Sequence, residues 1–188
     1  MTPPTDANRH LIRREESVLV IIDVQERLVP HIDRDAAVVA NIARLARFAP
    51  IVELPIVVTE QMKLGPTVAE IGLHLEGVTP ITKADFGCFG CEGFAEALSA
   101  LGRSALILAG IEAHICVAQT ALQALEQHTV HVVSDAVGSR TPENRQIALD
   151  RMRQAGAVIT STEMVMYELL VRAGTDEFRQ ALELVKGE

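Results

Sequence analysis

The sequence predicts an α/β domain of three layers, in which two layers of helices enclose a parallel β-sheet. Three observations lead to this fold class. Apolar runs of strand length alternate with segments of helical period along the whole chain. Hydrophobic residues make up 48% of the chain but aromatic residues only 3%, so the core consists mainly of Ala, Val, Ile and Leu, as in strands buried on both faces. The 188 residues suit one domain, and no linker, repeat or low-complexity stretch divides them.

Six apolar runs predict the buried strands of this sheet. They are residues 17–23, 55–60, 78–82, 105–111, 130–133 and 157–160. Helices are expected between them, at residues 35–48, 92–101, 114–127 and 142–155, and helical segments continue after residue 160. Residues 1–14 are polar and charged and are expected to form a loose N-terminal arm, so that residues 15–188 make up the single domain.

Two of the predicted helices carry clear end signals. Thr141 and Pro142 have the residue types of an N-cap and a first helical position, and Gly156 has that of a closing glycine. Gly102 follows the helix at residues 92–101 in the same way. Strands and helices that alternate with such boundaries predict a parallel sheet whose two faces are covered by helices.

Composition and charge exclude several classes of protein. The formal net charge is -8 and the pI about 5.3, with scattered basic residues, which argues against a nucleic-acid surface. No run of about 18 apolar residues could span a membrane, and the polar N-terminus is unlike a signal peptide. Three cysteines are too few for a disulfide scaffold. We therefore expect a soluble, cytoplasmic protein with reduced thiols.

Several chemically active residues follow the predicted strands. Asp23 ends the first strand, Glu60 the second, Lys83 follows the third, and the segment through Cys116 follows the fourth. In open parallel sheets, ligands bind outside the carboxyl ends of the strands, near the point where the strand order reverses. An acid, a base and a thiol are thus expected at one edge of the sheet, and we predict the functional site there.

Each of these three residues also has an ordinary structural interpretation. Cys116 lies in the first turn of a predicted helix, where free amides and the helix dipole favour a thiolate, but small buried cysteines are common in helices. Asp23 follows five apolar residues, where a carboxylate is costly unless paired or solvated, although it could cap a turn. Lysines are mostly exposed, so the ordinary interpretation of Lys83 is a residue at the surface. The shared edge favours the functional interpretation of all three.

The remaining candidate motifs are weaker. Cys88 and Cys91 form a lone Cys-Phe-Gly-Cys in a glycine-rich loop, which lacks the second half of a zinc site, and we interpret it as incidental with a redox or regulatory disulfide as the alternative. The six histidines show no metal-binding spacing. His114 and Cys116, two residues apart on a helix, do not face each other, which argues against a Cys–His dyad. Phosphate-binding and nucleophile-elbow motifs are absent.

Four segments resemble the isochorismatase-like hydrolases, and more narrowly the short isochorismatase domain-containing proteins. They are Val20-Ile-Ile-Asp-Val-Gln25, Thr59-Glu-Gln61, Leu108-Ala-Gly-Ile-Glu-Ala-His-Ile-Cys116 and Asp150-Arg-Met-Arg-Gln-Ala-Gly156. The likeness covers roughly residues 17–170. It implies a six-stranded parallel sheet of strand order 3-2-1-4-5-6 and a catalytic triad of Asp23, Lys83 and Cys116.

The resemblance also implies how the site is shaped. A cis, non-proline peptide is expected between Ile111 and Glu112, and the amides of Glu112 and Cys116 would form an oxyanion hole. Joined to acid–base chemistry, this suggests that Asp23 accepts the thiol proton and that Lys83 offsets negative charge. The thiolate then attacks an amide-like carbonyl, and water hydrolyses the thioester.

Departures from relatives narrow the expected chemistry. The nicotinamidases of this superfamily carry an Asp/His metal cluster, whereas residues 61–79 offer only His74 and two glutamates, so we expect neither a metal nor another cofactor. Gln25 and Phe86 are expected to face the pocket, as substrate contacts or as structural residues. The retained cysteine favours an amide hydrolase acting on a small molecule. Hydrolysis of isochorismate or a carbamate, or a non-catalytic scaffold of the same fold, are the alternatives, and relatives suggest a homo-oligomer.

Overall fold

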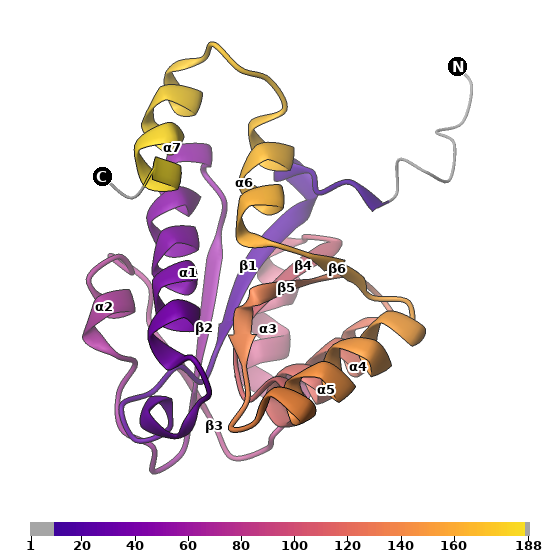
Figure 1. Cartoon of the computed structure of the whole chain (residues 1–188). Helices are drawn as coiled ribbons and strands as arrows, with labels where there is room; N and C mark the ends of the chain where they lie inside the picture. The colour runs from indigo at the N-terminus through magenta and orange to yellow at the C-terminus, as the bar shows by residue number, and fades with distance from the viewer. Residues whose placement is uncertain (1–9, 187–188) are drawn as a thin grey trace.

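The computed structural model describes residues 10–186, which contain a six-stranded sheet of order β3-β2-β1-β4-β5-β6 (Figure 1). All five neighbouring strand pairs are parallel. The strands are β1 (Ser17–Ile22), β2 (Ile56–Gln61), β3 (Ile81–Lys83), β4 (Ala105–Ile111), β5 (Thr129–Gly138) and β6 (Val158–Thr160). The predicted fold class and strand order are confirmed, and the order reverses between β1 and β4.

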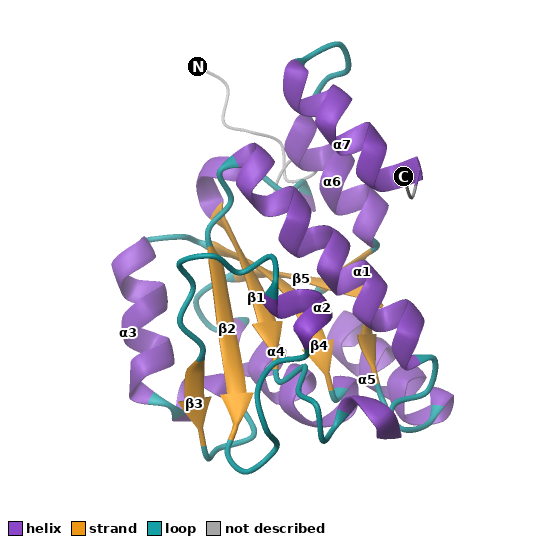
Figure 2. Ribbon diagram, turned by 90° about the vertical axis from the view of Figure 1, so that its left-hand side faces the viewer, coloured by secondary structure: helices purple, strands orange, loops and turns teal. Residues whose placement is uncertain are grey.

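The helices form two layers, one on each face of the sheet (Figures 1 and 2). They are α1 (Asp35–Phe48), α2 (Ala69–Gly72), α3 (Glu92–Leu101), α4 (Ala118–Ala124), α5 (Pro142–Gln154), α6 (Thr162–Leu170) and α7 (Asp176–Lys186). The first core cluster joins one face of the sheet to α1, α2, α6 and α7, and the second joins the other face to α3, α4 and α5. Every residue of β1 and β4 is buried, as expected for central strands of such a sheet.

The helix end signals behave as expected at α5. The Thr141 side chain accepts a hydrogen bond from the Asn144 N–H, and Pro142 is the first helical residue. Gly156, which follows the helix, has a φ of 110° that favours glycine. The turn into β6 is therefore fixed by local sequence.

Two strand boundaries differ from the prediction. Residues 78–82 were expected to form the third strand, but β3 begins only at Ile81, because Val78 still belongs to a turn after Gly77 and Pro80 has no N–H to donate. Lys83 therefore lies within the strand and pairs with Gln61. The fifth strand is ten residues long instead of four. Its pairing with β4 shifts register between Leu108 and Gly110, and β5 then continues through the polar residues 134 and 135 to Gly138.

The helix expected at residues 114–127 is also different. It begins with a π-helical turn, Ala113–Val117, and continues as the short helix α4. In this wider turn the N–H groups of Ile115 and Val117 both donate to the Glu112 carbonyl. Wider turns of this kind are common at functional sites, and this one carries Cys116.

Most of the predicted N-terminal arm, residues 1–9, lies outside the described residues. The described part of the arm is attached to the helical layer. Ile12 is buried and its N–H donates to the Glu168 carboxylate, while the Arg14 guanidinium donates to Glu177 at 2.9 Å. Among residues 10–186, no helix is both long and apolar enough to cross a membrane.

Candidate functional site

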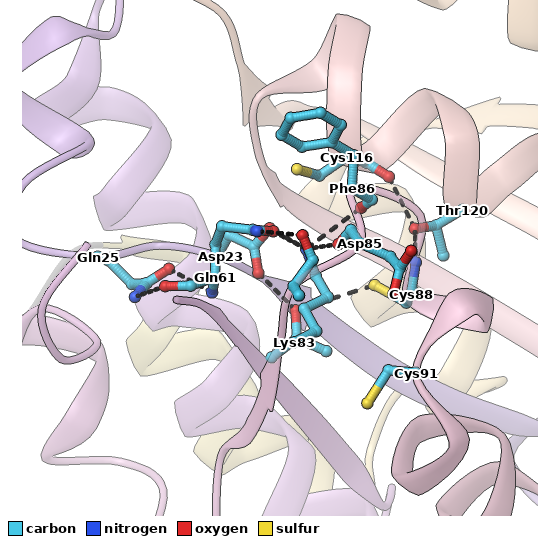
Figure 3. A network of polar contacts seen from close by, with 12 residues as sticks. Asp23, Gln25, Gln61, Lys83, Asp85, Phe86, Cys88, Cys91, Cys116 and Thr120 are labelled. Atoms are coloured by element: carbon cyan, nitrogen blue, oxygen red, sulfur yellow. Dashed lines mark hydrogen bonds and ion pairs between the residues drawn. The ribbon is translucent and has the colours of Figure 1, made fainter. Parts of the chain in front are cut away.

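The carboxyl ends of β1, β3 and β4 bring the three predicted catalytic residues into one cluster (Figure 3). Asp23 directly follows β1, Lys83 ends β3, and Cys116 lies in the π-helical turn after β4. Asp23 and Lys83 are in direct contact, and the charges of both act on the Cys116 thiol. The structure therefore assembles side chains that are 60 and 93 residues away from Asp23 in the sequence.

Asp23 and Lys83 form a fully buried ion pair. The Lys83 ammonium donates to Asp23 Oδ2 at 2.6 Å, and neither side chain is exposed to solvent. Breaking such a pair costs much free energy, because the remaining charge is left without water or a partner. A buried pair that ends in a cluster at a strand edge is more typical of a functional site than of a stabilising device.

Lys83 is also held by other acceptors. Its Nζ lies 2.7 Å from Gln61 Oε1, 3.1 Å from the Asp85 carbonyl and 3.2 Å from the Phe86 carbonyl. An ammonium has three N–H donors, so these acceptors and Asp23 together satisfy all of them. Lys83 is thus suited to fix and neutralise its surroundings instead of donating to a substrate.

Asp23 is held by the neighbouring strand β2. Its backbone N–H donates to the Thr59 carbonyl at 3.1 Å, and the Thr59 hydroxyl donates to Asp23 Oδ1 at 2.8 Å. Asp23 has a φ of 53°, in the left-handed region that non-glycine residues rarely adopt. Both carboxylate oxygens therefore have fixed partners, Thr59 on one and Lys83 on the other.

The Cys116 thiol is buried and is protonated at neutral pH. Burial and, next, the nearby Asp23 carboxylate raise the pKa of this thiol to about 12, against the opposing effect of Lys83. Desolvation and the Asp23 charge therefore oppose the thiolate that a helix start favours. Reaction at this sulfur requires a base that takes its proton.

The peptide bond between Ile111 and Glu112 is cis. It follows Gly110, whose φ of 130° and close approach to the Ile22 backbone leave no room for a side chain. Within the described residues, no acceptor takes the Glu112 N–H. This donor is therefore free for a ligand beside the π-helical turn.

The Glu112 side chain is anchored on the opposite side of the backbone by Arg140. The Arg140 guanidinium donates to Glu112 Oε1 at 2.6 Å and to Oε2 at 3.0 Å, in a bidentate pair. These hydrogen bonds hold the pKa of the Glu112 carboxyl below its usual range. Arg140 thus fixes the residue that carries the cis peptide.

Gln25 and Phe86 have different environments at this edge. Gln25 is buried, its Nε2 donates to the Gln61 and Gly65 carbonyls, and its Oε1 accepts from the Gln61 N–H. These contacts favour the structural alternative for Gln25, which ties β1 to the end of β2. Phe86 has 56% of its surface exposed, so its ring is available to a ligand.

The three cysteines are free, and they differ in environment. Cys88 is fully buried and its thiol contacts the Thr59 hydroxyl, whereas Cys91 is half-buried and its thiol contacts the Thr82 carbonyl. The two residues of the Cys-Phe-Gly-Cys motif therefore have separate surroundings. Cys88 belongs to the site and Cys91 does not.

Several residues of the site carried no clear signal in the sequence. Thr59 and Gln61 occur in the sequence only as part of a family motif, and no pattern points to Arg140. Thr59 could have been found from its position at the end of a strand next to the one that carries Asp23. Arg140 could not, because its contact depends on the unexpected length of β5. Within residues 10–186, no three His, Cys, Asp or Glu side chains form a group that could hold a metal ion.

Comparison with known proteins agrees with this architecture. A family model described as the isochorismatase domain matches residues 17–164. The chain is 40% identical over 173 residues to isochorismatase domain-containing protein 2 of Danio rerio, covering 90% of this chain and 86% of the relative. It is 38% identical over 177 residues to a secreted isochorismatase effector of Phytophthora sojae, covering 90% and 84%.

Solved structures give the same result. A MAR1 ribonuclease of Caenorhabditis elegans has a TM-score of 0.88 at 33% identity and covers 94% of this chain and 92% of its own. YcaC of Pseudomonas aeruginosa, solved with covalent acrylamide, has a TM-score of 0.87 at 27% identity, covering 93% and 91%. The YcaC product of Escherichia coli, an octameric hydrolase of unknown specificity, has a TM-score of 0.85 at 26% identity, covering 99% and 90%.

The three layers and the sheet order are those of the isochorismatase type of α/β fold. The chain belongs to the isochorismatase family. Within it, the chain is similar to the short isochorismatase domain-containing proteins, as the sequence motifs predict.

Proposed function

We propose that the protein is a cysteine-dependent hydrolase that cleaves a small amide-like substrate through a thioester. Cys116 is the nucleophile, Asp23 the base and Lys83 the group that offsets charge. The observation that carries this proposal is the fully buried Asp23–Lys83 pair beside a buried thiol. A chain selected only for stability gains little from such a pair, since apolar residues of similar size serve as well.

The first half of the reaction is proton transfer and attack. Because the thiol pKa is about 12, free thiolate is scarce, and Asp23 removes the proton as sulfur bonds to the substrate carbonyl carbon. The carbonyl electron pair moves to oxygen, and the N–H groups of Glu112 and Cys116 stabilise the oxyanion. When the carbonyl re-forms, the C–N bond breaks and the leaving nitrogen takes the proton from Asp23.

The second half releases the acid product. Asp23, again a carboxylate, takes a proton from water, and the hydroxide equivalent attacks the thioester carbon. The second oxyanion collapses, the C–S bond breaks, and the proton held by Asp23 returns to the Cys116 sulfur. Lys83 keeps its charge throughout, in accordance with its full set of acceptors.

The comparisons give additional support for an amide-like substrate. Acrylamide, which is covalently attached in the YcaC structure of Pseudomonas aeruginosa, is itself a small amide. The exposed ring of Phe86 is suited to contact an apolar part of such a substrate. The alternatives are hydrolysis of isochorismate or of a carbamate, and a non-catalytic scaffold of the same fold. A scaffold would show no turnover. The relative named a ribonuclease does not suggest a nucleic-acid substrate here, since the net charge is -8.

The experiment that tests this proposal is a screen of small primary and secondary amides, read out as released ammonia or amine. With a substrate found, we expect Cys116→Ala to reduce kcat by at least about 10³-fold, because the covalent route is lost. Cys91→Ala is the matched control and should keep full turnover. If Cys116→Ala retains wild-type turnover on that substrate, the mechanism is wrong.

A solved relative and the free cysteines bear on assembly and location. We propose a homo-oligomer, because a relative of the same fold is octameric. We propose a cytoplasmic location, which agrees with three free thiols, although one relative is a secreted effector. Light scattering of the purified chain tests the first proposal, and cell fractionation tests the second.

A further inference from the structure

Two threonine hydroxyls, those of Thr59 and Thr120, connect Cys88 to Asp23 and Cys116. The Cys88 thiol contacts Thr59 Oγ1 at 3.9 Å, and Thr59 Oγ1 contacts Asp23 at 2.8 Å. The Cys88 N–H donates to Thr120 Oγ1 at 3.0 Å, and Thr120 Oγ1 donates to the Cys116 carbonyl at 2.7 Å. The same residue is thus two hydrogen bonds away from both the base and the nucleophile.

The direction of the first branch follows from counting protons. An ionised carboxylate only accepts hydrogen bonds, so the single proton of the Thr59 hydroxyl is donated to Asp23. Thr59 Oγ1 can then only accept from Cys88, which makes the Cys88 S–H the donor. Burial raises the pKa of the Cys88 thiol to about 11, so this proton is present at neutral pH.

The second branch runs in the same direction. The Cys88 backbone N–H can only donate, so the Thr120 hydroxyl accepts from it and gives its own proton to the Cys116 carbonyl. Cys88, Thr59 and Thr120 are all fully buried, so water does not compete for these bonds. Each hydroxyl is therefore fixed in one orientation by a donor from Cys88.

We propose that Cys88 and Thr59 form a positioning relay, in which the Cys88 thiol orients the Thr59 hydroxyl and Thr59 in turn orients the Asp23 carboxylate toward Cys116. Without Thr59, Lys83 alone holds Asp23, through the other carboxylate oxygen. The carboxylate can then rotate away from the thiol. This inference rests on the proposed function, because it assigns the relay to the proton transfer from Cys116 to Asp23.

The test is the rate at which acrylamide modifies Cys116, followed by peptide mass spectrometry at pH 7.5. This reaction needs the thiol proton to be removed, and it needs no knowledge of the natural substrate. The variants are Thr59→Val, Thr59→Ser, Cys88→Ala and Cys88→Ser. Cys91→Ala is the matched control, since it removes the other thiol of the same motif. Unfolding temperatures establish that each variant is folded at the assay temperature.

We expect Thr59→Val to slow the modification by about 10-fold or more, the effect of losing one hydrogen bond to a charged group. Thr59→Ser, which restores the hydroxyl, should return the rate to within about threefold of wild type. Cys88→Ala should slow it by about threefold, since a thiol is a weak donor, and Cys88→Ser should restore it. Cys91→Ala should have no effect.

Two outcomes would overturn the relay. In one, Thr59→Val or Cys88→Ala modifies at the wild-type rate, so that the hydroxyl is not needed. In the other, Thr59→Ser is as slow as Thr59→Val, so that side-chain packing and not the hydroxyl matters. Failure of the proposed function is distinguishable, because Cys116 of the unaltered chain would then react no faster than Cys91, and this result removes both proposals.

Discussion

Two ion pairs of the same length, Asp23–Lys83 and Glu112–Arg140, differ in exposure. In both, the shortest distance between nitrogen and oxygen is 2.6 Å. Neither side chain of the Asp23–Lys83 pair is exposed, whereas in the Glu112–Arg140 pair the Arg140 side chain is 56% exposed. Distance alone therefore says little about what each pair contributes.

The difference in exposure gives the two pairs different roles. The Arg140 side chain lies in solvent whereas that of Glu112 is only 4% exposed, so this pair has one partner in water and fixes a backbone segment. No water can replace Asp23 or Lys83, so the removal of one leaves a buried charge. In the buried pair each charge is stabilised mainly by the other. Such an environment is suited to the proposed role of Asp23, a base that receives a proton and returns it.

The largest predicted effect is that of breaking the buried pair from one side. Lys83→Met leaves the Asp23 carboxylate buried with only the Thr59 hydroxyl, and we expect it to lower the free energy of unfolding by about 3–5 kcal/mol. Urea unfolding followed by circular dichroism measures this loss. The exposed Lys63→Met provides the control, and it should unfold close to wild type.

A double variant separates the pair from its members. Asp23→Asn combined with Lys83→Met removes both charges, so it should be more stable than the sum of the two single losses indicates. If Lys83→Met were as stable as Lys63→Met, the buried pair would not have the electrostatic cost that distinguishes it from Glu112–Arg140.

The fold was predictable from the sequence because its signals are local. Continuous apolar runs such as those of β1 and β4 report burial on both faces, and Thr141 with Pro142 marks a helix start. The strand order came from the family motifs, not from the runs themselves. The errors occurred where local signals end, at the turn before β3 and in the polar second half of β5.

The site was predictable only in part, since its geometry depends on contacts between distant segments. Asp23, Lys83 and Cys116 could be named because each follows a strand. The raised pKa of the Cys116 thiol could not be predicted, because burial and the proximity of the Asp23 charge arise only in the folded chain. The contacts of Cys88 with the two threonines had no counterpart in the sequence pattern for the same reason.

His131 is another buried titratable side chain, and unlike Asp23 and Lys83 it forms no ion pair among the described residues. It lies in β5, and its Nδ1 has no hydrogen-bond acceptor or donor among the described residues. Burial, together with the charge of His10, lowers the pKa of His131 to about 4. Between pH 6.5 and 4 the unfolded chain therefore takes up a proton that the folded chain does not, so stability is complete above pH 6.5 and falls with pH.

The size of this acid effect follows from the shift. At about 1.4 kcal/mol per pH unit, the contribution of His131 to the loss of stability between pH 6.5 and 4 is about 3 kcal/mol. We expect His131→Leu to remove this part of the pH dependence, as measured by urea unfolding across that range. His31→Gln, at an exposed position, should behave like wild type. An unchanged slope in His131→Leu would contradict the assignment.

The smallest predicted effect concerns the Glu112–Arg140 pair, of which only Arg140 is exposed. After Arg140→Ala, the backbone N–H of residue 140 can still donate to Glu112 Oε2, from which it lies 3.3 Å away in the native chain. This donor remains and the space left by the exposed guanidinium opens to solvent, so we expect the unfolding temperature to change less than in Lys83→Met. The remaining difference should shrink further in 1 M salt, which screens exposed charges at about 3 Å. A loss as large as that of Lys83→Met, independent of salt, would mean that exposure does not separate the two pairs. It would make the anchoring of Glu112 as important to the fold as the buried charges.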